Sequence, residues 1–221
     1  MAENLFPIFL KLAGRSSLVV GAGEIAASKI RSLLDAGAHV TVVAPRAGEE
    51  IQQLAAVGKI RWAARIFLPG DLENVFLAIA ATSDAEVNRL VFLESQRRGI
   101  LCNSVDDPPH CDFYFPSVVR RGDLQVAIST AGESPSLAQR LRIELEASLD
   151  ARLGEWLREI GELRREILAA VPASDARKSL LHRLASRESW EAWQRRQSVA
   201  ESAEIHAGDP EQDSSPVVVG Q

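Results

Sequence analysis

Cysteine is scarce in this sequence, and its few residues do not form the arrangements that build metal or redox sites. The 221-residue chain has two cysteines, Cys102 and Cys111, with neither a CxxC pair nor a metal-ligand spacing. His110 precedes Cys111, but two ligands this close in the sequence do not specify a tetrahedral site. We therefore expect two reduced thiols, no disulfide and no dedicated metal site.

Long apolar runs and an excess of positive charge are also missing. No segment approaches the roughly 20 apolar residues that cross a bilayer. The N-terminus, MAENLFPIFLKLAGR, lacks the apolar core and cleavage site of a signal peptide. The formal net charge of −5 does not favour nucleic acid or an anionic membrane surface. The sequence thus predicts a cytoplasmic protein whose partners include no nucleic acid and no membrane.

The first half of the chain alternates between short apolar runs and segments with helical periodicity. Helices are expected from Glu24 up to Gly37, which stops the first one, and at Glu49–Val57 and Ala85–Arg98. Strands are expected at Ser17–Val20, His39–Val43, Ile60–Ala64, Val75–Ala80 and Ile100–Asn103. Strands that are nearly all apolar and alternate with helices predict a parallel sheet covered on both faces. We predict an α/β fold class, with a Rossmann-type domain over residues 1–112.

The pattern changes after residue 112. Two strands are expected at Phe113–Val119 and Leu124–Ser129, and helical periodicity begins at Ser136 with leucines at every fourth position. Pro172 breaks this pattern, and a single further helix is expected from Ser174 to Gln197. We predict a small α+β segment over 113–147, a helical module over 148–200 and a disordered polar tail over 201–221.

A glycine turn joins the first strand to the first helix. Gly21-Ala22-Gly23-Glu24-Ile25-Ala26 matches the pattern GxGxxA, in which the glycines allow a tight turn and a close approach to a pyrophosphate. The helix N-terminus then offers free N–H groups to the phosphates. We predict that Gly21, Gly23, Glu24 and Ile25 contact a dinucleotide. We also expect Gly21→Asp to block binding while leaving the fold largely intact.

The acid that usually binds the adenosine ribose is missing after the second strand. That region reads Val43-Ala44-Pro45-Arg46, and Arg46 suits either the extra phosphate of NADP or a solvated loop. The chemistry of these residues leaves NAD and NADP open. Thr82 follows another strand end, where open parallel sheets bind ligands. Pro45, Arg46 and Thr82 therefore complete the predicted cofactor contacts.

A loop rich in aspartate follows the last strand of the predicted sheet. It reads CNSVDDPPHCDFYFP from Cys102, and its position predicts that it faces the cofactor crevice. Asn103 offers an amide and Asp106 a carboxylate there. The alternative is an Asx turn before a proline pair, with no part in chemistry.

Several of these pieces together resemble a known family. They are LFPIFLKLAGRSSLVVGAGEIAASKIRSLLDAGAHVTVVAP, AIAATSD, CNSVDDPPHCDFYFPS and GDLQVAISTAGESPSLAQRLR, in this order. The chain is similar to the precorrin-2 dehydrogenase/sirohydrochlorin ferrochelatase family, which includes the N-terminal half of siroheme synthases. This resemblance implies NAD as cofactor, a homodimer formed through about 113–146, Asp106 as the catalytic residue and Ser134 near the tetrapyrrole.

The resemblance implies NAD-dependent oxidation of precorrin-2 to sirohydrochlorin in siroheme biosynthesis, and leaves open whether Fe²⁺ is a second substrate. The carboxylate arms of precorrin-2 call for guanidinium partners. Arg120, Arg121, Arg140 and Arg142 are candidates, unless they are solvated surface residues. With Asn103 and Ser134, we predict Arg120 and Arg140 as substrate contacts. The alternatives are an NAD-binding regulatory module without tetrapyrrole turnover, a chelatase without dehydrogenase activity, or another NAD(P) oxidoreductase.

Overall fold

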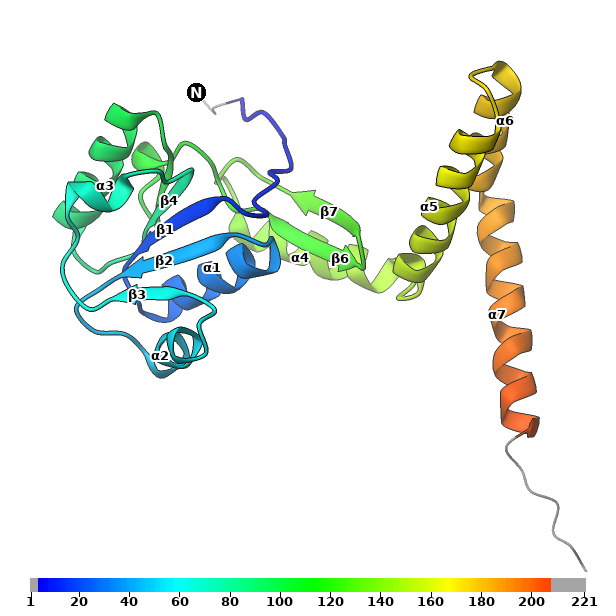
Figure 1. The fold of residues 1–221 in the computed structure, drawn as a ribbon, viewed down its shortest axis with the longest axis horizontal. Coiled ribbons are helices and arrows are strands. Elements are labelled where there is room, and N and C mark those ends of the chain that lie inside the picture. Colours follow the sequence, from blue (N-terminus) through cyan, green and yellow to red (C-terminus); the bar gives the residue numbers. More distant parts are fainter. Residues whose placement is uncertain (1–3, 208–221) are drawn as a thin grey trace, which may run out of the picture. The chain divides into compact units, whose positions relative to one another are not determined.

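The structure is a computed structural model that describes residues 4–207 (Figure 1). Within this range, the chain divides into two compact units. The first comprises residues 4–117 and 129–138, and the second comprises residues 118–128 and 139–207. The domain boundaries expected near residues 112 and 147 remain predictions. None of the helices in the described part of the chain combines the length and apolarity that a membrane span requires.

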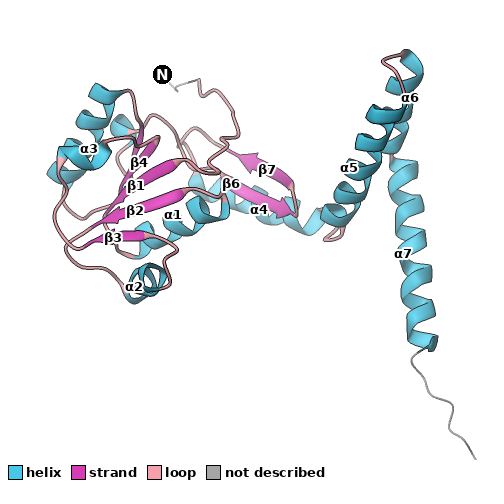
Figure 2. Ribbon diagram, in the orientation of Figure 1, coloured by secondary structure: helices cyan, strands magenta, loops and turns pink. Residues whose placement is uncertain are grey.

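The first unit is built on a five-stranded sheet in which each pair of neighbouring strands is parallel, in the order β3-β2-β1-β4-β5. Figure 2 labels β1 to β4 of this sheet. The strands are β1 (Ser16–Val20), β2 (His39–Val43), β3 (Arg61–Ala63), β4 (Leu77–Ala80) and β5 (Leu101–Ser104). The helices are α1 (Glu24–Asp35), α2 (Glu49–Ala56) and α3 (Ala85–Arg98), with short 3₁₀ turns at Pro69–Leu72 and Pro108–His110. The predicted Rossmann-type parallel sheet is confirmed.

Both faces of this sheet are covered, which explains why β1, β2 and β4 are mostly apolar. Val19 of β1 packs with Ile30 of α1 and Ile51 of α2 on one face. Leu18 of the same strand packs with Val91 of α3 on the other face. Because successive side chains of a strand point to opposite faces, a strand covered on both sides needs apolar residues at every position.

The carboxyl ends of four strands lie in register at one edge of the sheet. Val20 of β1 pairs with Val43 of β2 and with Ala80 of β4, and Ala80 pairs with Ser104 of β5. The loops that follow these strands therefore leave the sheet side by side. They carry the glycine turn, Arg46, Thr82 and Asp106.

The second unit contains a strand pair and most of the helical part of the chain. Its elements are β6 (Ser117–Arg121), β7 (Leu124–Ile128), α4 (Pro135–Ser148), α5 (Leu153–Ala170), α6 (Asp175–Leu184) and α7 (Arg187–Ala207), of which β6 and α4 begin in the first unit. The strand expected from Phe113 begins only at Ser117. Phe113 and Phe115 instead pack edge to face, with ring centroids 5.4 Å apart.

Two helical boundaries differ from the sequence prediction. The single helix expected over Ser174–Gln197 is broken between α6 and α7, because the Ser186 hydroxyl accepts a hydrogen bond from the backbone N–H of Ser189 and starts a new helix. Residues 201–207, which the sequence prediction assigned to a disordered tail, are helical, since α7 continues to Ala207. The rest of that tail, residues 208–221, lies outside the described residues.

A tight backbone contact fixes the junction between the strand pair and α5. The guanidinium of Arg121 donates to the carbonyl oxygens of Glu146 and Leu149, which lie at the end of α4. A Cβ atom added at Gly154 would lie 2.6 Å from the carbonyl oxygen of Arg121 and 2.7 Å from the nitrogen of Gly122. Glycine at position 154 therefore allows the first turn of α5 to approach the turn between β6 and β7.

Candidate cofactor and substrate site

The first glycine of the turn is required by the fold itself. Gly21 has φ +109°, which few side chains tolerate, and its N–H donates to the carbonyl oxygen of Val43 at 3.0 Å. A Cβ atom there would lie 2.2 Å from the carbonyl oxygen of Ala81. The expectation that Gly21→Asp leaves the fold largely intact is therefore wrong, because the added side chain collides with backbone of the loop after β4.

The second glycine leaves open space at the start of α1. Gly23 is the N-cap residue of α1, no side chain caps this end, and a Cβ atom added at Gly23 would meet nothing within 4 Å. The N–H groups of the first turn thus face a space that a phosphate can fill. Glu24 and Ile25, which begin the helix, are both exposed. These residues fit a dinucleotide, and their individual contacts with it remain predictions.

The other predicted cofactor residues lie in the adjoining loops. Pro45 and Arg46 follow β2 and are exposed. Thr82 follows β4, and its hydroxyl lies 2.7 Å from Oδ1 of Asn88, whose amide nitrogen donates to the carbonyl oxygen of Thr82 at 3.0 Å. Sequence reasoning missed Asn88, a buried polar residue on α3 that shapes this loop. The direct contact of Thr82 with a cofactor stays a prediction.

Hydrogen bonds close the aspartate loop at its base. The Asp112 carboxylate accepts from Nε2 of Gln96 on α3 and from the N–H of Cys102, each at 2.8 Å. Nδ2 of the buried Asn103 donates to the carbonyl oxygen of Phe113 at 2.7 Å. The amide nitrogen of Asn103 thus holds the loop together. Its contact with substrate stays a prediction.

The two adjacent aspartates have different surroundings. Asp107 lies 2.7 Å from Nδ1 of His110, and the ring of His110 packs edge to face on Phe92. Asp106 is exposed and has φ +61°, a left-handed conformation that aspartate adopts more readily than most residues. The left-handed backbone of Asp106 is compatible with both the chemical role and the structural alternative.

A lysine on α1 and an aromatic ring at the end of the aspartate loop, both missed in the sequence, lie close to each other. Nζ of Lys29 on α1 is 3.8 Å from the ring centroid of Phe115. Burial lowers the pKa of Lys29, and the negative charge of Asp106 acts in the opposite direction. The available signal was helical spacing: Lys29 follows Ile25 by four residues, so it continues the helix face that begins at the predicted cofactor site.

Ser134 lies in the first unit, where its hydroxyl caps a helix. Its Oγ accepts from the N–H of Leu137 at 3.2 Å, and its own N–H donates to Oγ1 of Thr130 at 3.2 Å. Ala131 in the same loop has φ +50°, a strained value for a residue with a Cβ atom. The structure gives Ser134 a capping role, and its contact with the tetrapyrrole stays a prediction.

The candidate arginines belong to the second unit and differ in their partners. Arg121 binds carbonyl oxygens at the end of α4, and Arg142 pairs with Glu146 on its own helix. Arg120 and Arg140 are exposed, and Arg140 lies 3.7 Å from Glu144. Arg121 thus has a structural role. Carboxylate binding by Arg120 and Arg140 stays a prediction.

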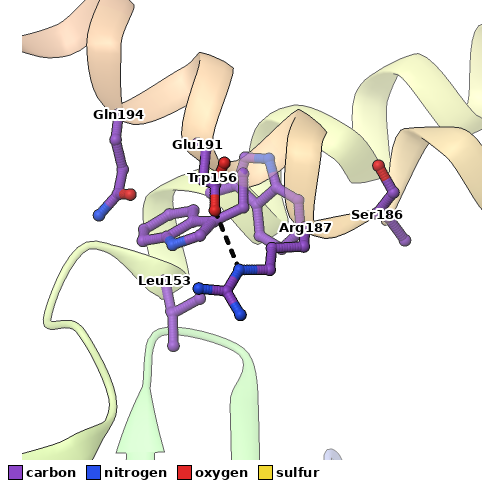
Figure 3. A pocket seen from close by; sticks show the side chains of 8 residues that line it. Leu153, Trp156, Ser186, Arg187, Glu191 and Gln194 are labelled. Atoms are coloured by element: carbon purple, nitrogen blue, oxygen red, sulfur yellow. Dashed lines mark hydrogen bonds and ion pairs between the residues drawn. The ribbon is translucent and has the colours of Figure 1, made fainter.

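The second unit also has a cavity, which the predicted site residues do not line. It is an open pocket of about 450 Å³ where α5 meets the junction of α6 and α7, and its lining includes Trp190 and Trp156, the second of which is labelled in Figure 3. Arg187 and Glu191 also line it and form an ion pair, with the atoms 2.9 Å apart. Within the described residues, no group of three or more histidines, cysteines or acids is placed to hold a metal.

Two family models match this chain. Residues 8–117 match the model of an NAD(P)-binding family, and residues 121–148 match the central region of a sirohaem biosynthesis protein. The solved structure described as SirC, precorrin-2 dehydrogenase, is 32% identical with a TM-score of 0.73, over 83% of this chain and 91% of that one. The chain belongs to the precorrin-2 dehydrogenase family. The resemblance stated from the sequence motifs is confirmed.

Siroheme synthases are also similar to this member of the family. Siroheme synthase 1 of Yersinia enterocolitica is 48% identical over 164 residues, which are 74% of this chain and 35% of that protein. The siroheme synthase of Neisseria meningitidis serogroup C is 45% identical over 175 residues, or 79% of this chain and 36% of that one. The chain therefore spans about a third of the length of the siroheme synthases that it matches.

Proposed function

We propose that this protein oxidises precorrin-2 to sirohydrochlorin with NAD as hydride acceptor, as part of siroheme biosynthesis. The observation that carries the proposal is the shared edge of the sheet: the glycine turn after β1 and the Asp106 loop after β5 leave this edge on either side of β4. A cofactor on the turn and a substrate against the loop then meet in one crevice. The family membership supports this choice of substrate.

In the proposed reaction, precorrin-2 loses a hydride and a proton, giving sirohydrochlorin, NADH and H⁺. Bound NAD supplies the hydride acceptor. The N–H groups at the start of α1 hold its pyrophosphate, and Gly23 leaves room for it. Asp106 is the proposed base that takes the proton, because it is an exposed carboxylate at the substrate side of the crevice.

An anaerobic assay tests this function. Purified protein is mixed with precorrin-2 and either NAD or NADP, and the absorbance of sirohydrochlorin and of the reduced nicotinamide is followed. We expect turnover with NAD and much slower turnover with NADP. The regulatory alternative predicts NADH binding without tetrapyrrole turnover, so binding alone with no product contradicts the proposal.

Fe²⁺ enters the proposal as a second substrate rather than as a resident metal. Insertion of Fe²⁺ into sirohydrochlorin requires loss of the pyrrole N–H protons, and Asp106 is the carboxylate that this crevice offers for them. The same assay with Fe²⁺ added tests this step through the absorbance of the metallated product. A chelatase without dehydrogenase activity would metallate added sirohydrochlorin but leave precorrin-2 unchanged.

We further propose a cytoplasmic homodimer whose contact surface includes α4 and the strand pair β6–β7. The support is the apolar surface of α4, where Leu137, Ile143 and Leu145 are 39%, 52% and 36% exposed. A helix that leaves three large apolar side chains in water gains stability when a second surface covers them. Sedimentation equilibrium tests the proposal, and a mass of 24.1 kDa, that of one chain, at micromolar concentration contradicts it.

A further inference from the structure

Lys29 lies on the side of α1 that meets the aspartate loop. Val105 and Phe113, from the beginning and the end of that loop, pack against the core cluster that contains Ile30 of α1. Nζ of Lys29 lies 3.8 Å from the ring centroid of Phe115, which follows in the same loop. The loop thus packs on the face of the sheet that α1 covers, and Lys29 meets its last aromatic ring.

The ammonium group of Lys29 has an aromatic neighbour but no counter-ion. Within residues 4–207 it forms neither a hydrogen bond nor an ion pair, and the carboxylate of Asp106 acts on it only through space. The side chain is half-buried, and burial of a charge is costly unless an opposite charge offsets it. Attraction to a ring face recovers only part of that cost. Lys29 can therefore gain stability by binding an anion from outside the chain.

Exposed apolar side chains flank this ammonium group and restrict the kind of anion that fits. Phe115 is 36% exposed and packs edge to face on Phe113. Ile25, which lies one turn before Lys29 on the same face of α1, is 51% exposed. A small hydrated anion leaves such side chains in water, whereas a carboxylate attached to an apolar ring system covers them. The surroundings thus fit a ligand with charged groups at the edge of an apolar body.

We propose that Lys29 binds a carboxylate arm of the tetrapyrrole substrate and contributes to the selection of this substrate class. The inference rests on the proposed function, in which the substrate lies against the aspartate loop. Precorrin-2 carries its carboxylate arms around an apolar macrocycle, so an arm on Lys29 brings the ring system close to Phe115. Because the ammonium group is half-buried, its ion pair with that arm is screened less than a pair on the open surface.

Two other roles for Lys29 predict different results. If Lys29 binds a phosphate of the dinucleotide, its loss weakens NADH binding and leaves tetrapyrrole binding unchanged. If Lys29 only stabilises the fold through Phe115, its loss lowers the melting temperature, and the dependence of tetrapyrrole affinity on salt stays that of wild type. The affinity for a tetrapyrrole at low and high salt therefore separates the proposed role from both.

The experiment compares wild type with Lys29→Met, Lys29→Arg and Arg31→Met by their affinity for sirohydrochlorin, the product, whose binding requires no turnover. Methionine keeps an unbranched side chain without the charge, and arginine keeps the charge. Arg31 lies on the same helix, is exposed and pairs with Glu50, so Arg31→Met is a matched control for loss of a cation from α1.

For each protein, the absorbance of sirohydrochlorin is titrated anaerobically at about 0.05 M and about 0.5 M salt, between which the screening of charges differs strongly. NADH affinity and melting temperature are measured on the same samples. The kinetic constants kcat and KM for precorrin-2 are measured with NAD.

We expect Lys29→Met to bind sirohydrochlorin about tenfold more weakly than wild type at low salt, the usual effect of losing one charged contact. KM for precorrin-2 should rise by a similar factor, with kcat near wild type. At high salt the difference in affinity should shrink to less than about threefold, because ions screen the charge that was removed. Lys29→Arg should keep most of the affinity, Arg31→Met should match wild type, and NADH affinity and melting temperature should stay unchanged.

Equal affinity of Lys29→Met and wild type for sirohydrochlorin at low salt overturns the inference, as does a loss of affinity that is the same at both salt concentrations. If Lys29→Met does not fold, Lys29→Gln takes its place, since glutamine is polar and uncharged, and the same expectations apply. The titration also separates this inference from the proposed function. A wild-type protein that binds sirohydrochlorin through Lys29 but does not oxidise precorrin-2 overturns the function alone, and one that binds no sirohydrochlorin overturns the inference.

Discussion

The carboxylate of Asp107 lies 2.7 Å from Nδ1 of His110, whereas the side chain of its neighbour Asp106 is exposed. Two adjacent carboxylates on one loop thus have different surroundings. Asp107 belongs to a local pair within the loop. Asp106 is exposed after the end of β5, as its proposed role as the base requires.

This difference predicts opposite outcomes for two matched substitutions. Asp106→Asn removes a proton acceptor with almost no change of shape, and asparagine tolerates the left-handed backbone at this position. We expect kcat for NAD reduction by precorrin-2 to fall by roughly 10²–10⁴-fold, the usual contribution of a general base. NADH affinity, measured by fluorescence titration, should change little.

Asp107→Asn is the control for that experiment. It weakens the pairing with His110, a partly exposed interaction that contributes about 0–1 kcal/mol to stability. Its kcat should stay within a few-fold of wild type. If Asp106→Asn retains more than about a tenth of the rate, the catalytic assignment fails. A large loss of rate in Asp107→Asn alone would show that Asp107, and not Asp106, is the base.

The two glycines of the turn give a second prediction, in which binding and folding are separated. At Gly23 an added side chain meets nothing within 4 Å, so Gly23→Val should fold with a melting temperature near that of wild type. It should nevertheless weaken NADH binding at least about tenfold, because the side chain fills the space next to the pyrophosphate. NADH fluorescence titration and thermal unfolding together measure both effects.

Gly21→Ala provides the contrast. Its Cβ atom would lie 2.2 Å from the carbonyl oxygen of Ala81, and φ +109° is unfavourable for alanine. We expect a destabilised protein, with the free energy of unfolding lowered by about 1–3 kcal/mol. Should Gly21→Ala be as stable as Gly23→Val, the close approach of the turn to the loop after β4 would be disproved.

The sheet was predictable from the sequence because its strands carry an unambiguous pattern. β2 has the predicted bounds, as does α3, which starts after the capping side chain of Asp84 and ends at Gly99 in the left-handed conformation. Such signals are local, and tertiary packing reinforces them. The break between α6 and α7 was missed because one hydrogen bond, from the N–H of Ser189 to the Ser186 hydroxyl, ends a continuous helical pattern.

The candidate site was predictable where it lies at strand ends and unpredictable where it depends on tertiary contacts. Asp106 was found from its place after β5. Lys29 was not, because only folding brings α1 to the aromatic segment that ends the aspartate loop. The consequence of a substitution at Gly21 was misjudged for a similar reason, since the atom that it would hit belongs to Ala81, distant in the sequence.

The thiols give a prediction about reactivity and pH. Burial raises the pKa of Cys102 from its ordinary 9.0 to about 12. Burial also raises the pKa of Cys111. Because the thiolate is the reactive form, Cys102 should not react with a disulfide reagent such as DTNB at pH 8 while the protein is folded. In a Cys111→Ala variant, in which Cys102 is the one remaining thiol, we expect reaction with DTNB only after denaturant is added.

The same shift has a consequence for stability. The folded state favours the neutral thiol of Cys102, so its stabilising contribution is complete below about pH 9 and is lost as pH rises toward 12. The free energy of unfolding, measured with denaturant, should therefore differ less between wild type and Cys102→Ala at about pH 10.5 than at about pH 8. Rapid reaction of native Cys102 at pH 8 would contradict the burial on which this prediction rests.

The last prediction concerns two glycines of α5, Gly154 in its first turn and Gly161 in its interior. A Cβ atom at Gly154 would lie 2.6 Å from the carbonyl oxygen of Arg121, so Gly154→Ala must force the helix and the β6–β7 turn apart. We expect the free energy of unfolding to fall by about 1–3 kcal/mol, the usual effect of overpacking.

At Gly161 the nearest atom to an added Cβ atom, Nη1 of Arg165, is 3.7 Å away, which is ordinary contact. Gly161→Ala should therefore raise stability by about 0.5–1 kcal/mol, because alanine loses less entropy than glycine in a helix. Urea unfolding followed by tryptophan fluorescence measures both, since Trp156, Trp190 and Trp193 report on the second unit. Equal stability of the two variants would show that the backbone contact between Gly154 and Arg121 is not close in solution.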